Sequence, residues 1–216
     1  LVGYQDRIRV GLEQDGVIVV DAGLIDNLDK SAAAADLFVK EGVDLIFLYI
    51  STYALSSTVL PVVQKTKVPV VVLNLQPVSR IYYETFNSLP SREAKTGEWL
   101  AHCQACSVPE IASVFNRAGI DYHLVTGTLA DPEAWAEINS WVDAAYVARV
   151  FRQGRIGLLG HYYNGMLDVY SDYTQLASVF GNHFELVEID ELKSLRDAST
   201  EWDVDHMLAE FRLTFD

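Results

Sequence analysis

The densest cluster of reactive side chains in the sequence is His102-Cys103-Gln104-Ala105-Cys106. Two cysteines separated by two residues have the spacing of a redox pair or of half a zinc site. A structural zinc site would need a second pair of such ligands, and the chain has 2 cysteines in all. A thioredoxin-like pair would lie at a strand-to-helix turn near the start of its fold. We therefore interpret both cysteines as buried or half-buried thiols without a metal or redox role.

Neutral polar residues follow several apolar runs that have the length of β-strands. They are Ser51, Thr52 and Tyr53; Asn74 and Gln76; Thr126 and Thr128; and His161 within the segment 160–165. Ligands of open parallel sheets usually bind at the carboxyl ends of the strands. Hydroxyl, amide and imidazole groups at such positions suit a ligand rich in hydroxyl groups. The alternative for each of them is an ordinary role as a turn or cap residue.

Familiar catalytic and nucleotide-binding motifs are absent from the sequence. It contains no G-x-G-x-x-G or Walker motif, no H-E-x-x-H metal site and no G-x-S-x-G nucleophile elbow. The acidic group Glu188, Asp190 and Glu191 is interpreted as a solvated helix start, where carboxylates complement the helix dipole. The residues alone therefore predict no catalytic residue and no metal ligand within this chain.

Six apolar, β-branched runs of strand length predict the elements that would position these side chains. They are residues 17–21, 45–50, 68–73, 122–126, 156–159 and 184–189. Their hydrophobicity is continuous rather than alternating, as in strands buried on both faces of a parallel sheet that helices cover. The predicted fold class is α/β, with a doubly wound parallel sheet of the Rossmann or flavodoxin-like type.

Helix signals lie between these runs. Ser31 precedes an Ala-rich helical segment, residues 107–110 have the Ser-x-x-Glu pattern of a capping box, and Asp131-Pro132 is a typical helix start. In the helix after Asp131, one face carries Trp135, Ile138, Val142, Ala145 and Arg149. Residues 77–99 lack such a pattern and predict a long loop.

The chain is expected to contain one domain and part of another. A new strand begins after Gly154, so we predict an N-terminal α/β domain over residues 1–154 and the incomplete start of a central α/β domain over residues 155–216. The second part has too few strands for an independent doubly wound sheet. Because the first residues run directly into a helical pattern, we also expect the sequence to begin within a longer protein.

Composition excludes several classes of partner. The formal net charge is -14, which disfavours binding to nucleic acid. The apolar runs are far shorter than a membrane span, so no membrane is expected. No signal-peptide pattern precedes the first domain, and 2 cysteines are too few for a disulfide framework. We expect a cytoplasmic protein.

Several segments, taken in order, resemble the L-arabinose isomerase and L-fucose isomerase family. The segments are 44–53, a strand that ends in Ser-Thr-Tyr; 68–76, a proline-led strand that ends in Gln; 102–110, which resembles the family's Asn-Gln-Ser/Thr-Ala-His-Gly segment; and 125–127 with 138–141, which resemble the next strand and helix. The resemblance spans roughly residues 17–155, and residue 155 matches the start of the family's central domain.

The resemblance implies an aldose–ketose isomerase that uses a divalent ion, typically manganese, with ligands in the family's later domains. This chain alone would be inactive, with no cofactor of its own. It would supply scaffold, contacts of a homo-oligomer and part of a sugar pocket, to which Gln76, Gln104 and, more weakly, Thr52 carry over. We add His161 from its place after a strand. The family's two histidines in this region are Ser51 and Ser107 here, which leaves the sugar undefined.

Two other classes of protein stay open at this point. A sugar-binding protein of the periplasmic-binding-protein type would share the parallel-sheet design and bind sugar without metal. A pure assembly module would use its acidic surface and the aromatic residues Tyr82, Tyr83 and Phe86 for oligomer contacts only.

Overall fold

Three parallel strands form the sheet of the N-terminal part in this computed structural model, which describes residues 2–14 and 16–215. They are β1 (Ile46–Tyr49), β2 (Val70–Gln76) and β3 (Tyr122–Thr128), in the spatial order β1-β2-β3. The register pairs Ile46 with Val70, and Val70 with Tyr122. The predicted parallel pairing of these runs is therefore confirmed.

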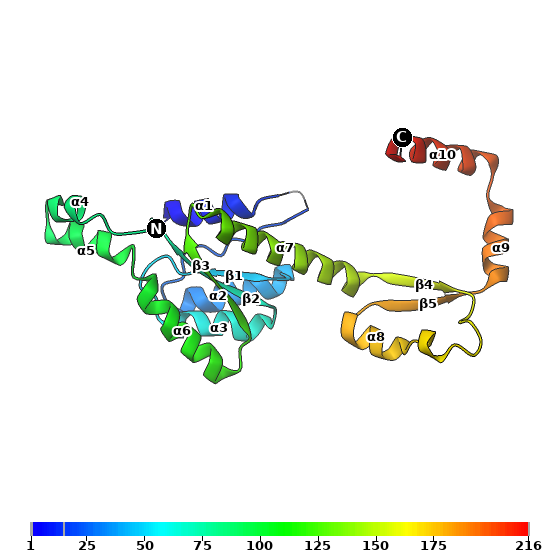
Figure 1. Ribbon diagram of the computed structural model, residues 1–216, viewed down its shortest axis with the longest axis horizontal. Helices are drawn as coiled ribbons and strands as arrows, with labels where there is room; N and C mark the ends of the chain where they lie inside the picture. Colours follow the sequence, from blue (N-terminus) through cyan, green and yellow to red (C-terminus); the bar gives the residue numbers. More distant parts are fainter. Residues whose placement is uncertain (1, 15, 216) are drawn as a thin grey trace. The chain divides into compact units, whose positions relative to one another are not determined.

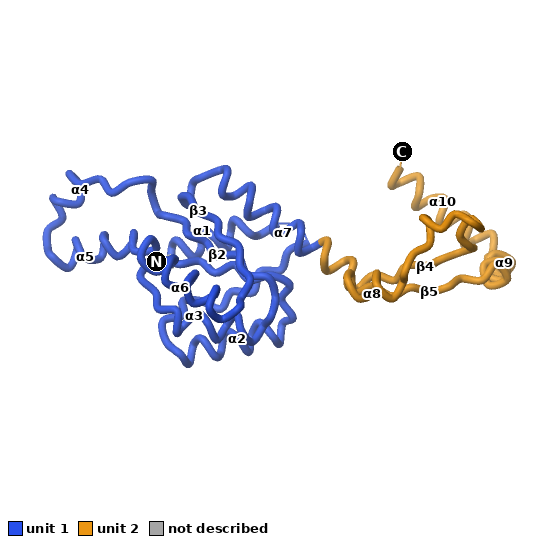
Figure 2. The backbone as a smooth tube through the Cα atoms, turned by 60° about the horizontal axis from the view of Figure 1, so that its bottom comes forward, with its two compact units in different colours: residues 1–146 blue, residues 147–216 orange. Residues whose placement is uncertain are grey.

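The chain divides into two compact units, residues 1–146 and residues 147–216 (Figure 2). The division falls within the long helix α7 (Pro132–Gln153), N-terminal to the boundary that the sequence predicts near Gly154. Among the described residues, no helix is long and apolar enough to cross a membrane. Leu1, at the start of the predicted helical pattern, lies outside the described residues.

Helices cover both faces of the first sheet (Figure 1). Alternate residues of β2 pack into different clusters. Helices α1 (Val2–Leu12) and α7 meet one face, where the cluster contains Ile8, Leu12, Val71, Leu73, Leu75, Val125, Ala134, Ile138 and Val142. Helices α3 (Ser56–Thr66) and α6 (Gln104–Ala118) meet the other face, where it contains Ile50, Val59, Val63, Val70, Val72, Val108, Ile111 and Phe115. This double coverage explains why β2 has a continuous apolar sequence.

Of the helix starts predicted at Ser31 and at Asp131-Pro132, the structure moves the first and keeps the second. Helix α2 (Leu28–Glu41) begins earlier than expected, because Asn27 accepts the capping hydrogen bond from the Lys30 backbone; Ser31 is buried inside the helix. Asp131, in contrast, accepts from the Glu133 backbone at 3.0 Å, just before Pro132 starts α7. The helix start predicted at Asp131-Pro132 is confirmed.

The predicted capping box at residues 107–110 is wrong as a local motif. Helix α6 already begins at Gln104, so Ser107 and Glu110 lie inside it. The Ser107 hydroxyl accepts from the Ala54 backbone N–H at 2.7 Å, and the Glu110 carboxylate accepts from the Ser56 backbone N–H at 3.1 Å. These side chains satisfy backbone donors at the start of the neighbouring helix α3.

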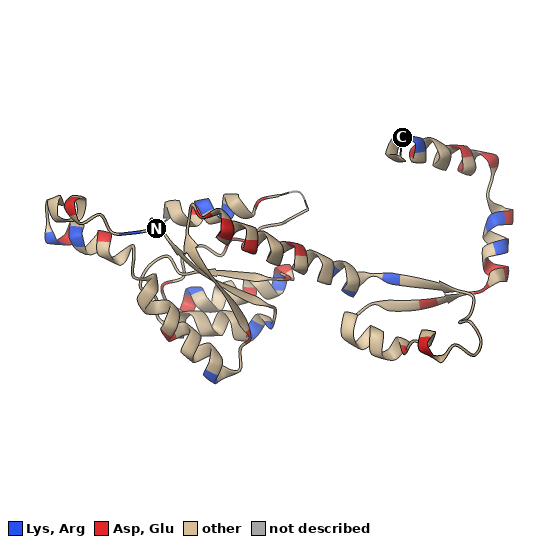
Figure 3. Ribbon diagram, in the orientation of Figure 1, with Lys and Arg blue, Asp and Glu red and all other residues tan. Residues whose placement is uncertain are grey.

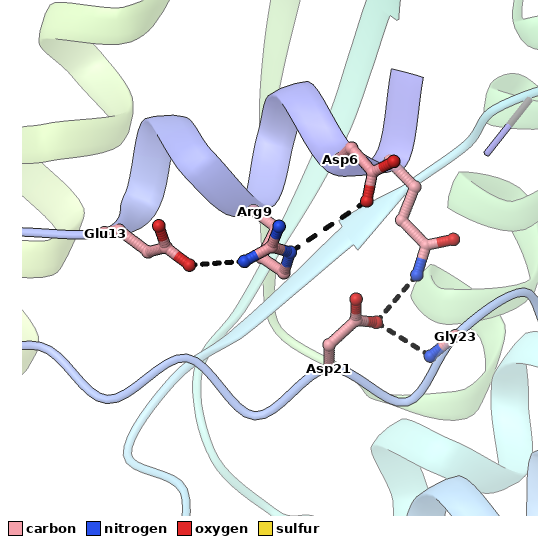
Figure 4. A network of polar contacts seen from close by, with 6 residues as sticks. Asp6, Arg9, Glu13, Asp21 and Gly23 are labelled. Carbon is pink, nitrogen blue, oxygen red and sulfur yellow. Dashed lines mark hydrogen bonds and ion pairs between the residues drawn. The ribbon is translucent and has the colours of Figure 1, made fainter. Parts of the chain in front are cut away.

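The predicted strand at residues 17–21 is also wrong, because this segment forms no strand ladder. Val17 and Val19 pack against the first core cluster, while Ile18 between them is 90% exposed. The Asp21 carboxylate accepts from the Gly23 backbone N–H and from Gln5 of α1, both at 2.7 Å (Figure 4). Side-chain contacts to α1 therefore hold the segment in place of a backbone ladder.

A close contact joins helices α1 and α7. The backbone of Gly11 approaches the Trp135 ring so closely that an added Cβ would lie 2.3 Å from a ring carbon. The Trp135 ring is held in turn by its Nε1, which donates to the Leu129 carbonyl at 3.0 Å. Only a residue without a side chain fits at position 11 in this arrangement.

The long loop predicted at residues 77–99 contains two short helices. They are α4 (Tyr83–Ser88) and α5 (Arg92–Leu100), and neither has a buried residue. Ser91 caps α5 by accepting from the Ala94 backbone at 3.1 Å. The periodic apolar pattern that normally indicates a helix is missing because these helices do not cover the core.

The second unit contains a two-stranded parallel sheet and short helices. Its elements are β4 (Arg155–Leu159), the short 3-10 helix η1 (Leu167–Val169), α8 (Tyr173–Phe180), β5 (His183–Val187), α9 (Ile189–Ala198) and α10 (Glu201–Phe215). Asp190 and Glu191 lie in the first turn of α9, which confirms the predicted helix start there. The chain is thus a mixed α/β protein with small parallel sheets, and the described strands alone do not confirm a doubly wound arrangement.

Candidate functional site

The carboxyl ends of β1, β2 and β3 meet at one edge of the first sheet, which we call the carboxyl edge and define as residues 49–51, 74–76 and 126–128 (Figure 1). Asn74 pairs in register with Thr126, and its Nδ2 donates to the Thr126 hydroxyl at 3.3 Å. Parallel strands bring these polar side chains together because all of the strands end on the same side.

Gln104 reaches this edge from the first residue of α6. Its side chain is completely buried, at 0% exposure. Its Nε2 donates to the Ser51 carbonyl at 3.3 Å, while its Oε1 forms no hydrogen bond with any described residue. A buried amide oxygen without a partner is costly, by about 1–3 kcal/mol. The protein itself therefore provides a hydrogen bond for the NH₂ group of this amide but not for its oxygen.

Tyr49, the last residue of β1, also has an unpartnered polar atom at this edge. Its buried hydroxyl forms no hydrogen bond of normal geometry with any described residue. Burial raises the pKa of Tyr49 to about 12, and Tyr4 adds to the rise, while Arg7 and the Gln104 amide oppose it. The groups that influence the phenol thus come from α1 and α6. Tyr49 thus joins Gln104 at the carboxyl edge.

A third buried atom, the Oδ1 of Asn74, likewise has no hydrogen-bond partner within residues 2–14 and 16–215. Tyr49, Asn74 and Gln104 at the carboxyl edge thus each have a buried polar atom without a hydrogen bond of normal geometry to a described residue. Tyr49 packs on the α1 and α7 face of the sheet, whereas strand alternation places Asn74 on the α3 and α6 face. Native proteins leave few buried polar atoms in this state, and such atoms are available to a ligand or to an ordered water. Chemically, the set can accept from and donate to the hydroxyl groups of a neutral ligand.

Three of the four residues predicted to bind a ligand, Thr52, Gln76 and Gln104, belong to the first unit. Gln104 lies at the carboxyl edge as described, and Gln76 ends β2 there, half-buried. The Gln76 side chain forms no hydrogen bond with a described residue, whereas its carbonyl accepts from the Leu129 backbone at 2.9 Å. Thr52 follows β1, but its hydroxyl donates to the Leu100 carbonyl at 2.8 Å and so anchors the end of α5.

His161 lies in the second unit, after β4, and its side chain is exposed. It therefore belongs to a different unit from the carboxyl edge. Close to it along the chain, Tyr162 contacts the rings of Tyr170 and Tyr173, with centroids 5.1 Å and 6.1 Å apart. These aromatic contacts hold together the segment that follows β4.

Sequence reasoning missed Tyr49 as a site residue. In the sequence, Tyr49 is simply an aromatic residue with a polar tip near the end of an apolar run. Such a residue is equally typical of a core strand. Arg7 was also missed, because it belongs to a helix far away in the sequence. Its Nη2 donates to the Leu129 carbonyl at 3.4 Å, which brings a positive charge near the carboxyl edge.

A metal ion does not fit this site. Among the described residues, no three His, Cys, Asp or Glu side chains gather closely enough to hold an ion. The donors at the carboxyl edge are amides and hydroxyls, whereas the predicted isomerase chemistry uses manganese bound by carboxylates and a histidine. No step through a metal is therefore assigned to these residues.

Surface hollows and charge do not single out another site. Two open hollows lie along α10 and the turn before it, and neither is lined by a predicted ligand-binding residue. Lys and Arg are scattered over the helices of both units rather than gathered in a stripe (Figure 3). The expectation that nucleic acid is not a partner stays a prediction.

Comparison with known proteins gives no family assignment. No family model matches the sequence, and no curated protein matches it significantly. The resemblance to arabinose and fucose isomerases therefore stays a prediction, and the geometry of the carboxyl edge has to carry the functional argument.

Proposed function

We propose that the carboxyl edge binds a hydroxyl-rich small molecule of the sugar class, and that the chain contributes this edge to an aldose–ketose isomerase. The observation that carries the proposal is the set of buried, unpartnered polar atoms on Tyr49, Asn74 and Gln104. A sugar hydroxyl both donates and accepts, so it can satisfy an amide oxygen and a phenol at once. Binding would then recover hydrogen bonds that folding leaves unmade.

The chemistry of the edge favours a neutral ligand over a phosphorylated one. Its lining groups are amides and hydroxyls, the chain has no phosphate-binding loop, and its formal net charge is -14. A phosphate would meet repulsion from the protein as a whole and little compensation nearby. Arg7 is the basic group near the edge, and its guanidinium already donates to the Leu129 carbonyl.

The isomerase part of the proposal comes from the family resemblance of residues 17–155. An aldose–ketose isomerase needs an ion that polarises the two sugar oxygens, and groups that move a proton between carbons. Manganese would be held by residues other than those gathered at the carboxyl edge. We therefore assign sugar binding to this chain and place it in a homo-oligomer, as part of a larger, doubly wound fold.

Titration of the chain with a panel of pentoses and deoxyhexoses, followed by NMR, tests the binding proposal. We expect shifts of the backbone signals of Tyr49, Asn74 and Gln104. Gln104→Leu removes the buried amide and should weaken binding at least tenfold, which corresponds to about 1.4 kcal/mol. The control Gln64→Leu makes the same change at an exposed position on α3 and should leave binding unchanged.

Two outcomes would contradict the proposal. If sugar shifts NMR signals of other residues but not those of the carboxyl edge, the sugar binds elsewhere. If Gln104→Leu and Gln64→Leu bind sugar equally well, Gln104 does not contact the sugar. For the isomerase part, ketose formation by the full-length protein with manganese, lost on chelation, is the expected result. Sugar binding without any turnover would retain the site and reject the isomerase.

A further inference from the structure

Cys103 and Cys106 occupy the first turn of α6. Cys103 is the N-cap residue, and the Cys106 backbone N–H donates to the Cys103 carbonyl at 3.1 Å. Residues three apart on a helix lie on the same side, with Cβ atoms about 5–6 Å apart. A disulfide requires about 3.5–4.5 Å between these atoms. For two helical residues at this spacing, the Cβ atoms would have to approach by roughly 1–2 Å for a disulfide to form.

The two thiols have very different environments. Cys103 is buried, and its Sγ lies 3.6 Å from the Trp99 carbonyl; Cys106 is exposed. The interpretation of both cysteines as buried or half-buried is therefore wrong for Cys106. Burial raises the pKa of the Cys103 thiol, and the neighbouring Cys106 raises it further. One thiol is thus open to reagents, while the other is protected but adjacent.

This asymmetry matches the two roles in thiol–disulfide exchange, those of an attacking thiol and a resolving thiol. The exposed thiol reacts first with a disulfide from solution, and a nearby second thiol resolves the product. The structure places the pair at a helix start, which the sequence alone did not reveal.

We propose that Cys106 and Cys103 form a reversible redox pair that exchanges electrons with low-molecular-weight disulfides such as glutathione disulfide. The Cys106 thiolate attacks one sulfur of glutathione disulfide, forms a mixed disulfide and releases one glutathione thiolate. The Cys103 thiolate then attacks the Cys106 sulfur and releases the second glutathione thiolate. The two cysteines are oxidised, the glutathione disulfide is reduced to two thiols, and the two cysteine protons pass to solvent or to the released thiolates.

The proposal is independent of sugar binding at the carboxyl edge. Zinc is a poorer explanation for the pair, because no third His, Cys, Asp or Glu completes a metal site with it among the described residues. A purely structural role explains the buried Cys103 but not the exposed partner on the same turn.

The experiment is equilibration of the whole chain in glutathione buffers of increasing oxidation, followed by acid quenching, thiol alkylation and mass spectrometry. Both cysteines lie in one tryptic peptide, residues 96–117, so an internal disulfide appears as a peptide that has lost two hydrogen atoms and carries no alkyl group. We expect this species to become the main form. Its fraction should fall as the ratio of the squared glutathione concentration to the glutathione disulfide concentration rises.

Two single variants test the order of attack. Cys103→Ser should accumulate the mixed disulfide of Cys106 with glutathione, because the resolving thiol is gone. Cys106→Ser should stay reduced at the buried Cys103. Circular dichroism shows whether each variant keeps its helices. Disulfide formation in the unaltered chain tests the proposal even if a variant fails to fold. A mixed disulfide that never resolves in the unaltered chain, or oxidation only between two chains, would overturn the proposal.

Discussion

The two units of the molecule differ in how they cover their apolar residues. In the first, β2 is buried along both of its faces by helices on either side. In the second, Asn182 alone is buried among the described residues, and many large apolar side chains are exposed. The exposed set on α10 includes Trp202, Val204, Met207, Leu208, Phe211, Leu213 and Phe215.

The number of strands explains this difference. A three-stranded sheet has a central strand, which neighbours cover from both sides and helices from both faces. A two-stranded sheet has only edges, and such a sheet is marginally stable in water without further packing. The two units therefore show that an apolar sequence predicts burial only where the fold provides enough neighbouring elements.

Truncation of a phenylalanine in each unit should give the largest contrast. Phe115 of α6 is fully buried, whereas Phe215 of α10 is 79% exposed. We expect Phe115→Ala to lower the free energy of unfolding by about 3–5 kcal/mol and Phe215→Ala to change it by less than about 0.5 kcal/mol. Urea unfolding followed by circular dichroism measures both. Equal losses would mean that α10 is covered as well as α6 is.

A pair of glycine substitutions within α1 sharpens the account of packing in the first unit. Alanine favours helices over glycine, so Gly3→Ala, at an open position, should stabilise the protein by about 0.5 kcal/mol. Gly11→Ala should instead destabilise it by about 1–3 kcal/mol, because the new methyl group meets the Trp135 ring. Thermal unfolding of both variants gives the comparison. A stabilising Gly11→Ala would show that α1 does not dock on α7.

The contact between α6 and α3 should contribute a smaller amount. Glu110→Ala removes the acceptor for the Ser56 backbone N–H and should cost about 1 kcal/mol, in the range of a lost helix cap. Glu110→Gln keeps an acceptor oxygen and should lose less. In the second unit, the exposed pair Arg155–Glu185 offers the contrast, since Arg155→Gln should cause no measurable loss. Loss of stability in Arg155→Gln alone would reverse this ranking.

A pH dependence caused by Tyr49 should be similar in size to the effect of Glu110→Ala. Its folded-state pKa is raised from 10.0 to about 12, mainly by burial. The unfolded chain therefore releases the phenol proton first, so the stability contributed by Tyr49 is complete below pH 10 and is lost as the pH rises toward about 12. With allowance for solvent screening, we expect roughly 1 kcal/mol.

The variant Tyr49→Phe isolates the contribution of the Tyr49 phenol to the pH dependence of stability. Its free energy of unfolding should fall less between pH 9 and pH 12 than that of the unaltered chain, on the order of 1 kcal/mol less. Below pH 9 the variant should be at least as stable, because it lacks a buried hydroxyl without a partner. Identical pH profiles would show that the phenol is solvated in the folded protein.

Local sequence patterns were sufficient for the central strands and for α7. The apolar runs at 45–50, 68–73 and 122–126 became β1, β2 and β3, because a continuous β-branched run favours a buried parallel strand wherever helices cover it. The face of α7 that includes Ile138 and Val142 packs on the sheet as its spacing predicts. These features depend on the chain's own periodicity, which a sequence displays directly.

Other features depended on partners that lie far away in the sequence. The run at 17–21 has strand composition, but no neighbouring strand completes its ladder, and Asp21 bonds to α1 instead. Ser107 and Glu110 have the spacing of a local cap and in fact serve α3. Of the predicted ligand-binding residues, Gln104 lies at the carboxyl edge beside Tyr49, whereas His161 belongs to the other unit.

The sequence by itself determined the α/β class, the parallel strands and the helix that spans both units. The tertiary structure alone decided which polar atoms are left without partners, and which of the two cysteines is exposed. The physical reason is that periodicity and propensity act over a few neighbouring residues, whereas burial and hydrogen-bond satisfaction depend on groups brought together from distant segments.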